Sequence, residues 1–138
     1  MDVPIYYLAV FLAAVSSLAV GAAWYSEALF GKPWKKALGV KEGGDKSELG
    51  MAIGGSFVLA LVTAYVLAHT IEFSHNYFHY SYLQTGLSTA FFLWLGMQMT
   101  SAVTHSLFEG SSKVVLKIRL GHDLVSLLLM GLIIALVR

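Results

Sequence analysis

Four long apolar segments constrain this chain more than any other feature of its sequence. They cover about residues 5–30, 49–73, 83–108 and 116–137. Each holds roughly 20 to 26 residues, or about 30 to 39 Å of helix at 1.5 Å per residue, which matches or slightly exceeds the hydrocarbon core of a bilayer. We therefore expect an all-α integral membrane four-helix bundle, with residues 1–138 forming a single transmembrane domain.

The composition agrees with a membrane protein. Hydrophobic residues make up 57% of the sequence, charged residues 12%, and the mean hydropathy is +0.71. A soluble domain of this length would need far more charge to stay in solution. The absence of cysteine excludes disulfides and thiolate metal sites. No phosphate-binding glycine loop or nucleic-acid signature occurs, so the expected partner is the lipid bilayer and not a nucleic acid.

The basic residues are distributed very unevenly and predict the topology. The first segment has no Lys or Arg before it, so it is interpreted as a retained helix and not as a signal peptide. Eight of the nine basic residues lie in two loops: Lys32, Lys35, Lys36, Lys41, Lys46, Lys113, Lys117 and Arg119. The positive-inside rule places both loops in the cytoplasm. Both termini, the loop over residues 74–82 and the exception, Arg138, are then outside.

Small residues recur at helical spacing in three of the segments. They are Ala9, Ala13, Ser17 and Gly21 in the first, Gly50 and Gly54 in the second, and Gly131 and Ala135 in the fourth. Such faces let helix backbones approach closely in lipid. Because four helices make a thin bundle, we expect a homo-oligomer formed through faces of this kind.

The third segment carries a polar line on an otherwise apolar helix. Gln98, Ser101, His105 and Glu109 fall on one helical face, and Trp94 lies one turn before Gln98. A lipid-facing helix has no use for such a line. We therefore expect this face to look into a protein interior.

A group of ionisable residues is expected near the cytoplasmic boundary. The apolar run after Asp123 has about 14 residues, or about 21 Å, which is too short to span, so His122 and Asp123 must lie at or below that boundary. Glu27, His105 and Glu109 are expected at a similar depth. One interpretation is a polar vestibule that serves as a proton relay, an ion site or a metal site. The other is a network of interhelical hydrogen bonds and salt bridges to the nearby basic residues.

A second group is expected near the outer boundary. The spacing H-x-x-E-x-x-H-x-x-x-H places His69, Glu72, His75 and His79 on one stripe if the helix continues past Phe73. Imidazole and carboxylate ligands suit a divalent metal. The alternative is a chance cluster of interfacial polar residues, since none of the standard zinc spacings is matched.

Three segments carry a resemblance to a known family. They are WYSEALFGKPW (24–34), FFLWLGMQMTSAVTHSLFEG (91–110) and LGHDLVSLLLMGLIIA (120–135). Together they resemble the DUF1761 family of small bacterial membrane proteins of unknown function. The resemblance implies a four-helix fold in the bacterial plasma membrane and supplies no mechanism. It rests on Trp24, Tyr25, Ser26, Phe30, Gly31, Trp34, Trp94, Gly96, Phe108, Glu109 and Gly110.

The favoured function is a transport, channel or small-ligand-binding subunit with a polar cavity inside the membrane. The residues expected along the ligand or ion pathway are Trp24, Tyr25, Ser26, Glu27, Trp94, Gln98, Ser101, His105, Glu109, His122 and Asp123. One alternative is a membrane-embedded enzyme with a His/carboxylate site, which is less favoured because no catalytic constellation is evident. The other is a structural or accessory subunit whose polar residues only hold the helices together.

Overall fold

The chain folds into helices joined by short connections. The computed structural model describes residues 2–39 and 46–138, so Lys41 lies outside the described residues. Within the described part no strand occurs. The helices are α1 (Tyr7–Trp24), α2 (Gly31–Leu38), α3 (Lys46–Phe78), α4 (Tyr82–Leu93), η1 (Trp94–Met99), α5 (Thr100–Glu109) and α6 (Lys113–Leu136).

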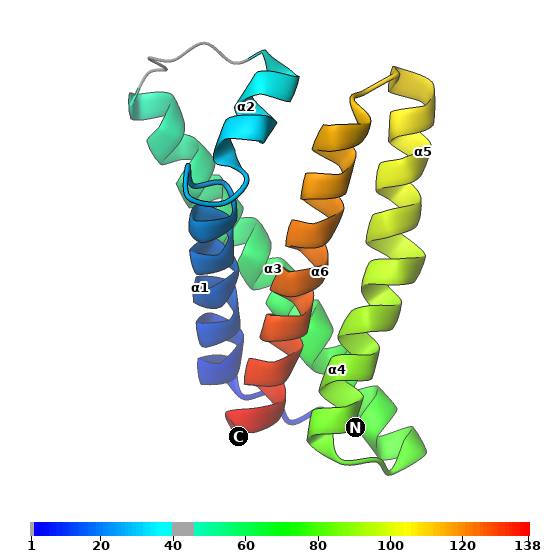
Figure 1. Ribbon diagram of the computed structural model, residues 1–138. Helices are drawn as coiled ribbons and strands as arrows, with labels where there is room; N and C mark the ends of the chain where they lie inside the picture. Colours follow the sequence, from blue (N-terminus) through cyan, green and yellow to red (C-terminus); the bar gives the residue numbers. More distant parts are fainter. Residues whose placement is uncertain (1, 40–45) are drawn as a thin grey trace.

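The long helices pack side by side, with α6 at the centre (Figure 1). α6 contacts both α1 and α4, and α3 packs against α1 and α4 while crossing the others diagonally (Figure 1). α4, η1 and α5 follow one another as one continuous rod. Both chain termini lie at one end, here called the Arg138 end, and the short helix α2 lies at the opposite end, called the α2 end (Figure 1).

Three helices in the described part of the chain are long and apolar enough to cross a membrane. They are α1, α3 from Ser47 to Phe78, and α6. The rod of α4, η1 and α5 is divided by its π-helical segment into pieces of 12, 6 and 10 residues, each shorter than a membrane span.

The core is made mainly of small residues, whereas many large apolar side chains point outward. Leu67, Ile71 and Met130 are the largest fully buried side chains, and they are surrounded by alanines. Exposed apolar side chains occur along every long helix, including Phe11, Leu59, Val62, Phe73, Phe92, Met97 and Leu136. This arrangement is the opposite of a soluble core, and it is typical of helices that approach closely in lipid.

The contact between α4 and α6 depends on two facing glycines. A Cβ added at Gly86 would lie 2.6 Å from the carbonyl oxygen of Gly131, and a Cβ added at Gly131 would lie 2.5 Å from that of Gly86. Both glycines are buried. No other residue fits at either position without separating the two helix backbones.

The first helix ends earlier than the predicted apolar segment over residues 5–30. α1 stops at Trp24, because the chain then reverses through residues 25–30 and begins α2 at Gly31. The amide of Phe30 donates to the carbonyl of Trp24 (3.0 Å), and a Cβ on Gly31 would lie 2.5 Å from the carbonyl oxygen of Tyr25. Pro33 lies in the first turn of α2, where its missing N–H has no cost.

Candidate functional site

A cavity of about 430 Å³ opens in the half of the molecule nearer the α2 end. It lies between α1, α3, η1 and α6, and polar side chains form most of its wall. A cavity of this volume falls within the range of small-molecule sites. Its lining residues are Ser17, Ser56, Leu59, Ala60, Thr63, Gln98, Arg119, His122, Asp123, Ser126, Leu127 and Met130.

Two hydrogen-bonded pairs organise the α6 side of this polar cavity. His122 Nδ1 donates to Asp123 Oδ1 at 3.0 Å, and these side chains are 19% and 24% exposed. One turn further along α6, Ser126 Oγ donates to Ser17 Oγ of α1 at 2.9 Å. Gly21 of α1 also lies beside His122, whose Nε2 would be 3.5 Å from a Cβ at that position, an ordinary van der Waals contact. The small-residue face of α1 therefore packs against α6 and also shapes the cavity.

Gln98 reaches the cavity from the π-helical segment η1. Its Oε1 atom is buried and has no hydrogen-bond partner among the described residues. The segment is held against α6 by Trp94, whose indole Nε1 donates to the carbonyl of Leu120 at 3.1 Å. Isolated π-helical turns are frequent at functional sites. Here the turn places an unpaired acceptor in the cavity wall.

A smaller, mostly apolar cavity of about 230 Å³ adjoins the polar one. The two share Thr63, Gln98 and Leu127. The remaining wall of the apolar cavity comes from α3, α4 and η1, through Val62, Val66, Leu67, Leu93 and Met97. Gln98 therefore stands at the junction between a polar and an apolar space.

Opposite charges line the polar cavity without pairing with each other. Arg119 and Asp123 are one turn apart on α6, yet the ion pairs found in the described part of the chain are His122–Asp123 and Arg138–Glu72. Both charges also act on Tyr25, which lies just after α1. Burial, followed by the negative charge of Asp123, raises the pKa of the Tyr25 hydroxyl, and the positive charge of Arg119 lowers it.

The expectation that the whole polar line faces a protein interior is wrong for this chain taken alone. Trp94 and Gln98 are half-buried, but Ser101, His105 and Glu109 are exposed. His105 Nδ1 donates to the carbonyl of Ser101 in its own helix, at 2.7 Å. The π-helical turn inserts extra backbone into the rod, so residues before and after it no longer share the face that a regular α-helical period would give them.

The predicted pathway residues near Trp24 stabilise the chain reversal instead of lining the cavity. Trp24 Nε1 donates to the carbonyl of Ile118 at 2.9 Å, and its ring packs on Gly121. Tyr25 lies 5.3 Å from the His122 ring, measured between centroids. Ser26 Oγ donates to Ala23 within the turn, and Glu27 is exposed without an ion pair among the described residues. Of the predicted inner ionisable residues, only His122 and Asp123 come together.

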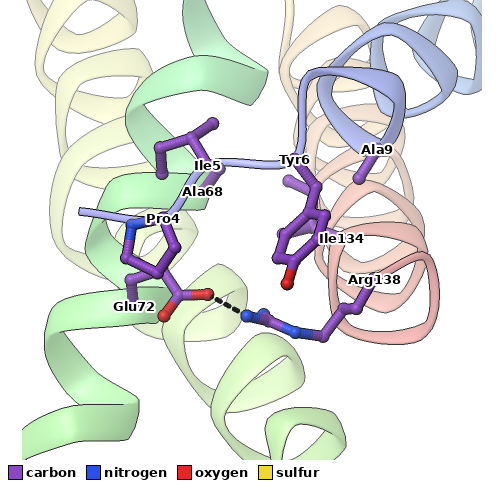
Figure 2. A pocket seen from close by; sticks show the side chains of 8 residues that line it. All are labelled: Pro4, Ile5, Tyr6, Ala9, Ala68, Glu72, Ile134 and Arg138. Atoms are coloured by element: carbon purple, nitrogen blue, oxygen red, sulfur yellow. Dashed lines mark ion pairs between the residues drawn. The ribbon is translucent and has the colours of Figure 1, made fainter. Parts of the chain in front are cut away.

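The Arg138 end holds a compact, paired cluster that sequence reasoning missed (Figure 2). Arg138 forms an ion pair with Glu72, which is only 3% exposed. The Tyr82 hydroxyl donates to the other Glu72 oxygen at 3.3 Å, and the Arg138 guanidinium lies 3.4 Å from the Tyr82 ring centroid. The Tyr6 ring also lies near Arg138, with its centroid 5.0 Å from the guanidinium carbon (Figure 2). The space left among these groups is about 10 Å³, so the cluster itself is tightly packed. A separate, mostly apolar cavity of about 410 Å³ lies at the same end, between the last part of α3 and α4.

The four residues predicted as a metal site are not brought together. No group of three or more metal-ligating side chains gathers anywhere in the described residues. Glu72 is engaged by Arg138, and His75 stacks on Tyr82 at 3.6 Å between ring centroids. His69 Nδ1 donates to the carbonyl of Tyr65, one turn back in α3. His79 follows the end of α3 with a left-handed φ of 58°, so it leaves the helical stripe.

Two signals in the sequence could have revealed the Glu72–Arg138 pair. Arg138 is the one basic residue expected at the outer side, and Glu72 is expected at the same depth within an apolar helix. A buried carboxylate requires a partner, and no other cation is expected nearby. The Ser17–Ser126 hydrogen bond could not be predicted from the sequence in the same way. Serines are common on small-residue helix faces whose only role is close packing.

These observations define a class: an all-helical protein with helices long enough to cross a membrane, an ion-paired cluster toward one end and a polar cavity toward the other. The particular family follows from a comparison of sequences. The family model described as protein of unknown function (DUF1761) matches residues 8–135, so the chain belongs to this family and the resemblance is confirmed. No curated protein and no solved structure matches the chain.

Proposed function

We propose that this chain is a ligand-binding membrane protein of the transport or channel type, whose ligand occupies the polar cavity. The observation that supports this most is the buried, unpaired Gln98 Oε1 in a cavity of about 430 Å³. An unpaired buried acceptor costs free energy unless water or a ligand supplies a donor.

The proposed topology is a four-helix transmembrane bundle in the bacterial plasma membrane. Its fourth crossing is the rod from α4 to α5, and the outward apolar side chains face lipid. The α2 end carries Lys32, Lys35 and Lys36 together with the basic start of α6, which supports a cytoplasmic position for this end. The Arg138 end, with its closed cluster, is then outside.

A homo-oligomer remains our proposal for the assembled state. The small residues of α1, α4 and α6 are used within the chain, but Cβ atoms at Gly50 and Gly54 of α3 would meet nothing within 4 Å. A GxxxG face that is open in the single chain suits a helix of a second copy. Cross-linking through a cysteine at Gly50, compared with one at Phe73 on the same helix, tests this face.

Thiol labelling tests the cavity directly, because the chain contains no cysteine. Ser56 lines the cavity and is exposed, whereas Phe11 is exposed on the apolar surface of α1. Ser56→Cys and Phe11→Cys are reconstituted in vesicles and treated with a membrane-impermeant thiol reagent from each side. The thiolate that reacts forms only in contact with water.

We expect Ser56→Cys to react from the cytoplasmic side and Phe11→Cys to react from neither side. Reaction of Ser56→Cys no faster than that of Phe11→Cys would show a dry groove and contradict the proposed function. Reaction from the outer side alone would contradict the proposed orientation, in which the α2 end is cytoplasmic. The same labelled position then reports ligands, since a bound ligand slows the reaction.

A further inference from the structure

The two adjoining cavities restrict the chemistry of a ligand that occupies both. Along α6 the polar cavity extends from Arg119 to Met130, about 16 Å at 1.5 Å per residue. Its charged groups lie at the α2 end, its hydroxyl and amide groups lie in the middle, and the apolar cavity continues past Gln98. A molecule that fills this sequence of environments has a charged head and an apolar tail.

The charges in the cavity wall indicate which head group could bind there. Arg119 offers N–H donors to an anionic oxygen, and Asp123 offers a carboxylate to a cation. Arg119 and Asp123 do not pair with each other, and Asp123 is engaged only by the neighbouring His122, so a head that carries both signs could contact both charges. Gln98 also lines the cavity, and rotation of its side-chain amide would present the unpaired Oε1 acceptor, which favours a cation that has N–H groups over a quaternary one.

The rim of both cavities faces the proposed lipid phase. Leu59 lines the polar cavity, Val62 and Met97 line the apolar one, and all three are exposed on outer helix surfaces. The opening lies beside α3, which contacts α1 and α4 more extensively than α6. A ligand can therefore enter sideways from the bilayer without first passing through water.

From this arrangement we propose that the cavities bind one zwitterionic phospholipid with a primary ammonium in its head group. The phosphate lies at Arg119, and the ammonium lies between Asp123 and Gln98. Part of one acyl chain occupies the apolar cavity, and the rest of the lipid stays in the bilayer. This inference rests on the proposed function, because both use the polar cavity.

Competition between lipids that differ in one group tests the inference. The full chain is reconstituted in vesicles with equal parts of palmitoyl-oleoyl phosphatidylethanolamine, phosphatidylcholine and phosphatidylglycerol. It is then released for native mass spectrometry, which counts the lipids retained. The choline lipid keeps the phosphate and chains but has no N–H, and the glycerol lipid has no cation. We expect the ethanolamine lipid to be retained about tenfold over the other two, as loss of a charged hydrogen bond implies.

Two variants separate recognition of the head from loss of structure. Asp123→Asn and Gln98→Leu are expected to lower retention of the ethanolamine lipid to that of the choline lipid. Glu109→Gln removes an exposed acidic charge outside the cavity and is expected to change neither. A variant that only loosened the fold would lower every lipid equally.

The outcomes also distinguish the inference from the proposed function. Equal retention of the three lipids, preference for the glycerol lipid, or an equal effect of Glu109→Gln would overturn the lipid proposal. If Ser56→Cys is labelled and soluble leucine slows the reaction while no lipid is preferred, the cavity binds a soluble zwitterion and only the lipid proposal fails. If Ser56→Cys is not labelled and no lipid is retained, both proposals fail.

Discussion

The two ends of the molecule differ in how their polar groups are paired and in how much space surrounds them. At the Arg138 end the charged groups are paired, covered by aromatic rings and packed with about 10 Å³ of space among them. Nearer the α2 end, a larger set of polar groups surrounds about 430 Å³, and Arg119 and Asp123 there do not pair with each other. At the Arg138 end Glu72 and Arg138 hold helices together, although His75 Nδ1 is buried there without a partner among the described residues. The cavity has two hydrogen-bonded pairs, His122–Asp123 and Ser17–Ser126, beside the unpaired Gln98 Oε1.

The two ends also differ in how the lost hydration of a buried polar group is compensated. A buried carboxylate is tolerated when a cation and hydrogen bonds compensate its lost hydration, as Arg138 and Tyr82 do for Glu72. A free acceptor such as Gln98 Oε1 has no such compensation from the protein. We therefore expect the compensated ion pair at the Arg138 end to support the folded state. The cavity, with its unpaired acceptor, lowers stability but leaves space for a ligand. Stability measurements on single variants can test this contrast.

The largest loss of stability is expected at the Arg138 end. Arg138→Ala leaves Glu72 buried without its cation, which we expect to lower the free energy of unfolding by about 3 to 5 kcal/mol. Lys117→Ala removes an exposed cation from the same helix and should change it by less than about 0.5 kcal/mol. Thermal unfolding in detergent, followed by circular dichroism, measures both. If both variants lose the same stability, the Glu72–Arg138 pair contributes no more than an exposed charge does.

The second-largest loss of stability is expected at the contact between α4 and α6. Gly131→Ala places a Cβ against the backbone of Gly86 and is expected to cost about 1 to 3 kcal/mol, as overpacking does. Gly54→Ala makes the same chemical change where nothing lies within 4 Å, and the higher helix propensity of alanine should leave stability equal or slightly raised. A loss at Gly54 as large as at Gly131 would point to backbone flexibility and not to helix contact.

The sequence predicted the helices well but predicted the site only in part, and the reasons differ. Apolar runs of membrane length mark helices because hydropathy is a local property, and three of the four expected segments became helices long and apolar enough to span. The end of α1 at Trp24 was not predictable, since it depends on the packing of Trp24 against Gly121 in a distant helix. The π-helical turn has no sequence periodicity of its own, so the polar line from Gln98 to Glu109 was drawn as if the helix were regular. His122 and Asp123 were found because ionisable residues inside an apolar run are conspicuous.

A smaller effect is expected where the cavity wall is attached to α6. Trp94→Phe removes the hydrogen bond from the indole to the carbonyl of Leu120 and should cost about 1 kcal/mol. Trp34 makes no side-chain hydrogen bond in the described residues, so Trp34→Phe should cost less. If the two changes cost the same in thermal unfolding, η1 is held by packing alone, and the π-helical turn needs another explanation.

The smallest effect is expected at Gln98, and it separates the two ends most sharply. Gln98→Leu removes the unpaired acceptor, so the free energy of unfolding should stay within about 0.5 kcal/mol or rise slightly. Ser126→Ala, in the same wall, removes the hydrogen bond to Ser17 and should cost about 1 kcal/mol. If Gln98→Leu instead lowered stability by 2 kcal/mol or more, Gln98 would be a structural group like Glu72, and the cavity would be another paired cluster. A variant that keeps its stability and loses the lipid would show that the acceptor is retained for binding.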